Sequence, residues 1–180
     1  MIPEAPLEQT DSGLKPNGEG WFVLNAREAA WQVSAGRGAY CKFEGDPAFS
    51  QLGIQLRALG PGEPMSMYHW EADQEDFLVL SGEALLICEG EERPLRAWDF
   101  VHCPAEAKHT ILGAGEEGCL CLAVGARDKS TGPEWGGYSV EEAAIRHGAG
   151  VAQETSNPRE AYKRFPDRQP TSYRNGWIPD

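Results

Sequence analysis

The sequence predicts an all-β protein built as a single antiparallel barrel or sandwich. From residue 52 onward, apolar and polar residues alternate with a period of two, which is the pattern of a strand with one buried face. Short strand-like runs recur every ~8–12 residues with turn-forming residues between them, as in β-barrels and β-sandwiches. Apart from one helical turn expected at residues 26–30, helix-like patterns occur beyond residue 127.

Composition limits the class of protein and its partners. The chain has 180 residues, enough for one domain with a sizeable core. Its net charge of −12 repels phosphate groups, so we expect neither nucleic acid nor a membrane as a partner. No apolar run approaches the ~20 residues of a spanning helix. The N-terminus lacks the pattern of a secretory signal, so we expect a cytoplasmic protein with reduced cysteines.

The barrel domain is expected over residues 21–126, after an N-terminal arm at residues 1–20 that is rich in Pro, Gly and Glu. A turn is expected at residues 81–83, and a hairpin loop at residues 113–118. Strands are expected at residues 21–24, 31–33, 40–43, 52–59, 65–71, 75–80, 84–88, 93–96, 100–103, 109–112 and 119–124.

A C-terminal extension with short helices is expected over residues 127–180. Ser139, with Glu142 three residues later, forms a capping-box pattern that predicts a helix over residues 140–147. Asn157 is followed by a proline, which predicts the start of a second short helix that runs through Phe165. The remaining tail is expected either to wrap a surface or to be loose.

The residues that carry chemistry cluster around the segment HWEADQE. Side chains alternate along a strand, so His69 and Glu71 point to the same side. Residues 72–74 are polar and predict a turn, after which Glu75 opens another strand. The later segment PAEAKH supplies His109. Two imidazoles and two carboxylates converging in a small barrel would bind a divalent metal ion.

These two segments resemble the motifs of the cupin family. His69, Glu75 and Gly82 have the spacing of the first cupin motif, with Glu71 in place of its second histidine. Pro104 and His109 match the second motif. The resemblance covers roughly residues 50–126 and implies a single cupin barrel of the jelly-roll type, with N-terminal strands and short C-terminal helices around it.

The resemblance also implies a metal centre. Its ligands would be His69, Glu71, Glu75 and His109, and its cofactor a divalent transition metal: Zn, Mn, Fe or Ni. Two carboxylates turned into a barrel without a cation would be costly, which agrees with this expectation. Glu71 is the candidate catalytic residue, as a mobile carboxylate that acts as a base.

An apolar pocket is expected beside the metal. Its side chains would share the face of the ligands and admit a partly apolar small molecule, although simple core filling explains the same pattern. His102 lies near the site in sequence, either facing the cavity or at its rim. The expected cavity-lining residues are Met65, Met67, Phe77, Val79, Ile111 and His102.

Three functions remain open from the sequence. The first is a metalloenzyme of the oxygenase or isomerase type that acts on a small organic molecule in the barrel cavity. The second is a non-catalytic module that binds a small ligand, with a structural or absent metal. The third is a structural or storage protein. Small cupins commonly pair, so a homodimer is expected, with Trp21, Phe22 and Trp31 offering apolar contact area.

Overall fold

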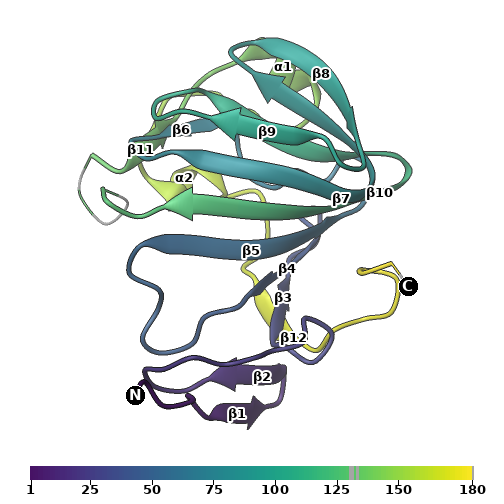
Figure 1. The fold of residues 1–180 in the computed structure, drawn as a ribbon. Coiled ribbons are helices and arrows are strands. Elements are labelled where there is room, and N and C mark those ends of the chain that lie inside the picture. Colours follow the sequence, from purple (N-terminus) through teal and green to yellow (C-terminus); the bar gives the residue numbers. More distant parts are fainter. Residues whose placement is uncertain (130–131, 133, 180) are drawn as a thin grey trace.

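The computed structural model describes residues 1–129, 132 and 134–179, and it is built mainly of antiparallel strands (Figure 1). The four residues outside these ranges, at positions 130, 131, 133 and 180, all belong to the expected extension over residues 127–180. The strands are β1 (Leu7–Thr10), β2 (Gly13–Pro16), β3 (Trp31–Val33), β4 (Ala39–Lys42), β5 (Leu52–Leu59), β6 (His69–Glu71), β7 (Glu75–Cys88), β8 (Glu91–Arg96), β9 (Phe100–Cys103), β10 (His109–Ala126), β11 (Gly136–Tyr138) and β12 (Gln169–Thr171).

The long strands β7 and β10 form the centre of the barrel. They pair antiparallel with each other, while β8 and β9 pair with β7 (Figure 1). From β10 the sheet continues through β5, β4 and β3 to β12 on one side, and through β6 to β11 on the other. The prediction of an all-β antiparallel fold is confirmed.

Two expected breaks in the barrel are wrong. Residues 81–83 and 113–118 form neither a turn nor a hairpin loop, because β7 and β10 each run through as one strand, with two register shifts in their pairing. Gly82 has φ 74° and Gly118 has φ 77°. A Cβ on Gly82 would lie 2.0 Å from the Gly118 carbonyl oxygen, so glycine allows both strands to bend without parting.

The N-terminal segment is more regular than its composition predicts. Strands β1 and β2 pair as an antiparallel hairpin at the base of the molecule (Figure 1). The strand expected at residues 21–24 does not form, because Trp21 makes only an isolated bridge to Glu4. This hairpin is held to the following segment by a hydrogen bond of 2.8 Å from the Leu14 amide to the Glu28 carbonyl.

Both predicted helices are present and short. Helix α1 (Glu142–Arg146) is capped by the Glu141 carboxylate, which accepts from the Ala143 amide at 3.2 Å, and not by Ser139 as expected. Helix α2 (Pro158–Ala161) begins as predicted, with the Asn157 side chain accepting from the Arg159 amide at 3.0 Å, but it ends at Ala161 and does not reach Phe165. Within the described ranges, no helix has the length and apolarity needed to cross a membrane.

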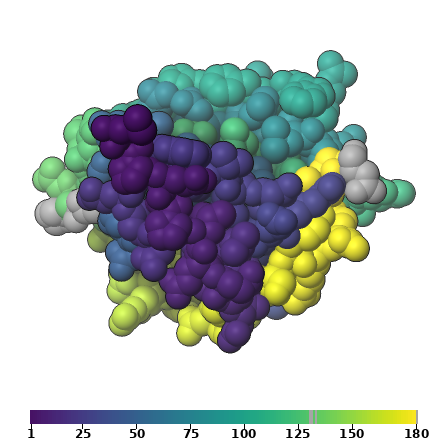
Figure 2. All heavy atoms as spheres, turned by 60° about the horizontal axis from the view of Figure 1, so that its bottom comes forward, coloured from purple at the N-terminus to yellow at the C-terminus, as the bar shows by residue number. Residues whose placement is uncertain are grey.

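The C-terminal tail covers one face of the sheet. Strand β12 pairs with β3, and the ring of Trp177 lies 5.0 Å from that of Trp31, centroid to centroid. Figure 2 shows the tail beside the N-terminal segment, where the Ser172 hydroxyl lies 3.4 Å from the Asp11 carbonyl oxygen. Trp31 is therefore fully buried within the chain and cannot supply a contact between subunits, although Trp21 stays half exposed.

Strand β5 has an apolar side that faces outward and a polar side that faces the barrel interior. Leu56 and Ala58 pack outward, in the cluster around Trp31. The alternate residues Gln55 and Arg57 turn inward and line a cavity. The sequence pattern of alternation is correct for this strand, but its polar side faces the barrel.

Candidate metal centre

Three strands bring the candidate ligands together. His69 opens β6, Glu75 opens β7 and His109 opens β10. His69 and His109 are direct partners in the antiparallel ladder between β6 and β10. One donor atom from each of the three residues lies within 4.8 Å of the other two.

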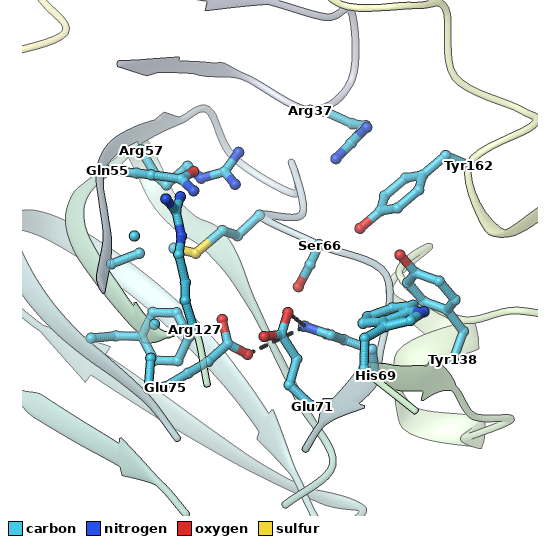
Figure 3. Close-up of a pocket in the computed structure, with 17 residues that line it drawn as sticks. Arg37, Gln55, Arg57, Ser66, His69, Glu71, Glu75, Arg127, Tyr138 and Tyr162 are labelled. Atoms are coloured by element: carbon cyan, nitrogen blue, oxygen red, sulfur yellow. Dashed lines mark ion pairs between the residues drawn. The ribbon is translucent and has the colours of Figure 1, made fainter. Parts of the chain in front are cut away.

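The connection between β6 and β7 is anchored from outside. The Asp73 carboxylate accepts from the Lys129 amide at 2.7 Å, and the Ala72 amide donates to the Trp135 carbonyl at 2.8 Å. These bonds hold the tight bend that the polar residues predict. As a result, Glu71 and Glu75 both point toward His69 (Figure 3).

The imidazole of His109 is oriented for coordination. Its Nδ1 lies 3.0 Å from the Ala107 carbonyl oxygen, and since a carbonyl only accepts, Nδ1 must donate. In the neutral ring this leaves a lone pair on Nε2, which is buried and has no hydrogen-bond partner. A backbone carbonyl on the far nitrogen is a common support for a metal-binding histidine.

Glu75 lies between the two imidazoles. Its Oε2 is 3.4 Å from Nε2 of His69 and 3.3 Å from Nε2 of His109, yet it is buried and neither contact has hydrogen-bond geometry. The three donors thus converge on shared space and do not pair with one another. A buried imidazole and carboxylate without partners fit a divalent cation, and two imidazoles with one carboxylate are a donor set that Zn, Mn, Fe or Ni accepts.

The charges of these groups are strongly linked. Burial alone would lower the pKa of His69, but Glu71 and Glu75 hold it well above its usual value. Burial opposes charge on His109 too, yet Cys103 and Glu75 raise its pKa to about 9. Burial works against ionisation of Glu75, but the two imidazoles keep its pKa below its ordinary value. The neighbouring carboxylates thus favour positive charge at this position, and a metal ion would compete with protons for the ring nitrogens.

Glu71 lies at the edge of this group. Its Oε1 is 3.6 Å from Nε2 of His69, and its side chain is 24% exposed against 2% for His109. It borders the cavity in Figure 3, where a carboxylate can reach either a metal ion or a bound molecule. Its expected roles as a fourth ligand and as a base stay predictions.

A cavity of about 340 Å³ opens beside the three donors. Met65 and Phe77, which the sequence predicts as lining residues, are on its wall. The polar and aromatic residues on the same wall include Arg37, Gln55, Arg57, Ser66, Arg127, Trp135, Tyr138 and Tyr162.

The other predicted lining residues lie elsewhere. Val79 and Ile111 are fully buried in the barrel core behind Phe77. Met67 packs with Tyr138 and Val151 on another side, because residues 65–68 are not a regular strand and the period-two pattern does not extend through them.

His102 points away from the cavity. It is the ladder partner of Asp76, whose side chain lies opposite to that of Glu75 along β7. Nδ1 of His102 is 2.7 Å from Oδ1 of Asp76, and the histidine side chain is 51% exposed. The sequence alone left this orientation open.

Sequence reasoning missed the cationic and aromatic wall of the cavity. Arg37 comes from the turn between β3 and β4, Arg57 from β5, and Tyr162 from the end of α2. The one available signal was the polar side of the alternating segment at residues 52–59, with Gln55 and Arg57 on it. No spacing rule connects segments so far apart.

Comparison with known families identifies the barrel. Residues 55–125 match the family described as the cupin domain. Residues 55–125 are a cupin domain. The match includes His69, Glu75 and His109 and excludes the N-terminal hairpin, β11, β12 and both helices. No curated protein matches the chain.

Solved structures share this cupin fold. A sugar phosphate isomerase of the cupin superfamily from Silicibacter pomeroyi has 22% identity and a TM-score of 0.51, over 58% of this chain and 75% of its own. An RmlC-like cupin from Shewanella frigidimarina has 14% identity and a TM-score of 0.50, over 59% and 90%. For an Acidithiobacillus ferrooxidans protein, provisionally assigned as a sugar phosphate isomerase, the values are 28%, 0.43, 50% and 60%. The chain thus spans less than two thirds of the length of this last protein.

Proposed function

We propose that this cupin is a metal-dependent enzyme that acts on a small organic molecule held in the barrel cavity. His69, Glu75 and His109 are the proposed permanent ligands of one divalent transition metal, and Glu71 is the more labile fourth. The proposed reaction is of the isomerase or oxygenase type. We further propose that residues 21–126 form the barrel domain, that residues of the C-terminal extension complete its cavity, and that the protein works as a cytoplasmic homodimer.

One observation supports this proposal above the others. Buried Oε2 of Glu75 and buried Nε2 of His109 lie 3.3 Å apart, have no hydrogen-bond partner, and adjoin a cavity of about 340 Å³. A site that only stabilised the barrel would have no need for a cavity beside unpaired donors. A metal bound there would supply Lewis-acid polarisation of a substrate oxygen or a site for dioxygen.

The chain's own residues supply the remaining chemistry. Glu71 borders the cavity next to His69, so its carboxylate can take up a proton from a bound molecule. The hydroxyls of Tyr138 and Tyr162 point toward one another at the cavity wall in Figure 3, and can orient an oxygen of the substrate. Phe77 covers the imidazole of His109, with ring centroids 5.3 Å apart, and limits the access of water.

The test begins with metal content. Elemental analysis of the protein, purified without chelators, is expected to give about one Zn, Mn, Fe or Ni per chain. Removal with EDTA should lower the melting temperature, and return of the metal should restore it, because an ion that binds only the folded state stabilises that state. A protein that holds no metal, and melts at the same temperature with and without all four ions, would favour the non-catalytic binding module.

A further inference from the structure

The cavity carries a second group of residues, which the metal-site proposal does not use. Arg37 and Arg57 lie on the wall away from Glu71 and Glu75, with Ser66 between the two groups (Figure 3). Arg168 lies behind them, with its guanidinium carbon 4.2 Å from the centre of the Tyr40 ring. That of Arg57 is 4.6 Å from the same ring. Two guanidinium groups therefore line one end of the cavity, and a third lies against the same tyrosine ring as Arg57, in a chain with a net charge of −12.

Within the described part of the chain, these arginines have no anionic partner. Among the residues that the structure describes, no carboxylate forms an ion pair with Arg37, Arg57 or Arg168. The buried nitrogens without a hydrogen-bond partner are Nε of Arg37, Nε and Nη1 of Arg57, and both Nη atoms of Arg168. The centre of the Tyr162 ring lies 3.8 Å from the Arg37 guanidinium carbon and attracts the cation. The ring does not replace an oxygen acceptor for the N–H groups.

Arg127 shows how a neighbouring arginine is satisfied. It borders the same cavity, but its guanidinium donates to both carboxylate oxygens of Glu44, at 2.7 and 2.8 Å, and to the Phe49 carbonyl at 2.6 Å. The absence of such partners at Arg57 is therefore particular to that end of the cavity. Burial together with the neighbouring arginines lowers the pKa of Arg168 to about 9, which reflects the cost of the cluster.

Buried guanidinium groups that lack acceptors weaken a protein, because their desolvation is not offset. Such a cluster is retained at a functional site when a ligand supplies the acceptors. The planar fork of arginine matches the oxygens of a carboxylate or a phosphate, which take two parallel hydrogen bonds. The volume of about 340 Å³ suits a small molecule.

We propose that Arg57 and Arg37 bind an oxyanion group, a carboxylate or a phosphate, at the end of the cavity away from the His69–Glu75–His109 cluster. Arg168 strengthens the positive potential from behind and is a positioning residue. This inference rests on the proposed function. With its anionic group bound to the arginines, the substrate would extend its uncharged part toward the metal centre. The substrate class is therefore a small organic acid or phosphate ester.

The experiment measures anion binding by thermal shift and by calorimetry on the metal-loaded full chain. Inorganic phosphate and acetate are the probes, and glycerol is the uncharged comparison. Wild type is expected to melt at least ~3 °C higher with saturating phosphate or acetate than with glycerol. The probe with the larger shift identifies the phosphate or the carboxylate as the natural group.

Arg57→Met is the decisive variant, because it keeps most of the flexible aliphatic stem and removes the charged guanidinium group. It should lose the anion shift, lower the affinity at least ~10-fold, and melt at or above the temperature of ligand-free wild type, since an unpaired buried charge is gone. Arg57→Lys should recover part of the affinity. Arg93→Gln removes an exposed positive charge from β8 and should bind the anion like wild type.

Anions can also bind directly to a metal, and the variants separate the two cases. If phosphate and acetate shift Arg57→Met as much as wild type, or do not shift wild type at all, the arginine site is refuted. The same holds if Arg57→Met changes the molecular mass in light scattering, because Arg57 would then belong to a subunit contact. Metal content is measured on each variant. A failure of the proposed metal site is therefore distinguished from a failure of the arginine site.

Discussion

Nδ1 of His109 donates a hydrogen bond of 3.0 Å to the carbonyl oxygen of Ala107. The bond turns Nε2 toward Oε2 of Glu75, on the same side as Nε2 of His69. The backbone just before β10 therefore orients one imidazole, while the β6–β10 ladder places the other next to it. This pair of constraints is the structural basis of the predictions for the metal centre.

Truncation of either histidine should empty the site. We expect His69→Ala and His109→Ala each to lower the metal content at least ~10-fold, because a divalent transition metal loses an imidazole that no neighbour replaces. The measurement is elemental analysis after purification. His102→Ala is the matched control, because His102 lies on β9 and points outward, and it should keep the wild-type content. Full metal content in the double variant at positions 69 and 109 would place the metal elsewhere.

Changes at Glu71 should have smaller effects on retention. Its side chain is more exposed than that of any of the three convergent donors, so Glu71→Ala should weaken metal binding less than His69→Ala does. Glu71→His should be tolerated, because it restores the donor that cupins usually have there. Glu71→Gln separates charge from shape. The measurement is competition with a chromophoric chelator, and a loss at Glu71→Ala equal to that at His69→Ala would make Glu71 an obligatory ligand.

Glu44 should make the stability of the fold depend on acid pH. The hydrogen bonds from Arg127 hold the pKa of Glu44 below its usual value of 4.5. A carboxyl with a lowered pKa in the folded state stabilises it above pH 4.5, and this contribution is lost as the pH falls through the folded value. Melting of Glu44→Gln should therefore be lower than wild type at neutral pH and converge with it in acid. Glu116→Gln changes an exposed carboxylate, and its melting temperature should follow that of wild type across the same pH range.

The C-terminal tail should contribute to the stability of the barrel. Trp177 packs on the fully buried Trp31 at a centroid distance of 5.0 Å. Because this contact covers the outer layer of the sheet, Trp177→Ala should lower the free energy of unfolding by about 2 kcal/mol. Trp98→Ala changes an indole that is 74% exposed and should stay within about 0.5 kcal/mol of wild type in urea titrations. Equal values for the two variants would show that the tail is not docked.

A homodimer stays a prediction, with a narrower basis than the sequence indicated. Of the three aromatic residues expected at the contact, Trp31 is covered by the tail and Phe22 stacks on Phe49 at 6.2 Å. Trp21 remains 53% exposed. Light scattering should give twice the chain mass of 19.7 kDa, and Trp21→Ser should shift the equilibrium toward monomer. A wild-type mass near 19.7 kDa at micromolar concentration would exclude the dimer.

The sequence by itself determined the class of fold and the candidate metal ligands. Alternation along a strand and the start of α2 at Asn157 are local, because they depend on backbone geometry and on caps within a few residues. The pairing of His69 with Glu71 on one side of β6 is local in the same sense. Glu75 and His109 were identified by their spacing in the motifs of the cupin family. In the structure, both lie in one cluster of donor atoms with His69.

Only the tertiary structure decided which side of each strand faces inward. In β5 both sides are covered, so alternation alone could not reveal that Arg57 faces the cavity and Leu56 the outer layer. His102 turns outward because its register with Asp76 is a long-range pairing, and residues 113–118 continue β10 because β7 bends with them. The meeting of Arg37 with Arg57 likewise depends on packing between distant segments, where contact is set by the whole barrel and leaves no mark in local spacing.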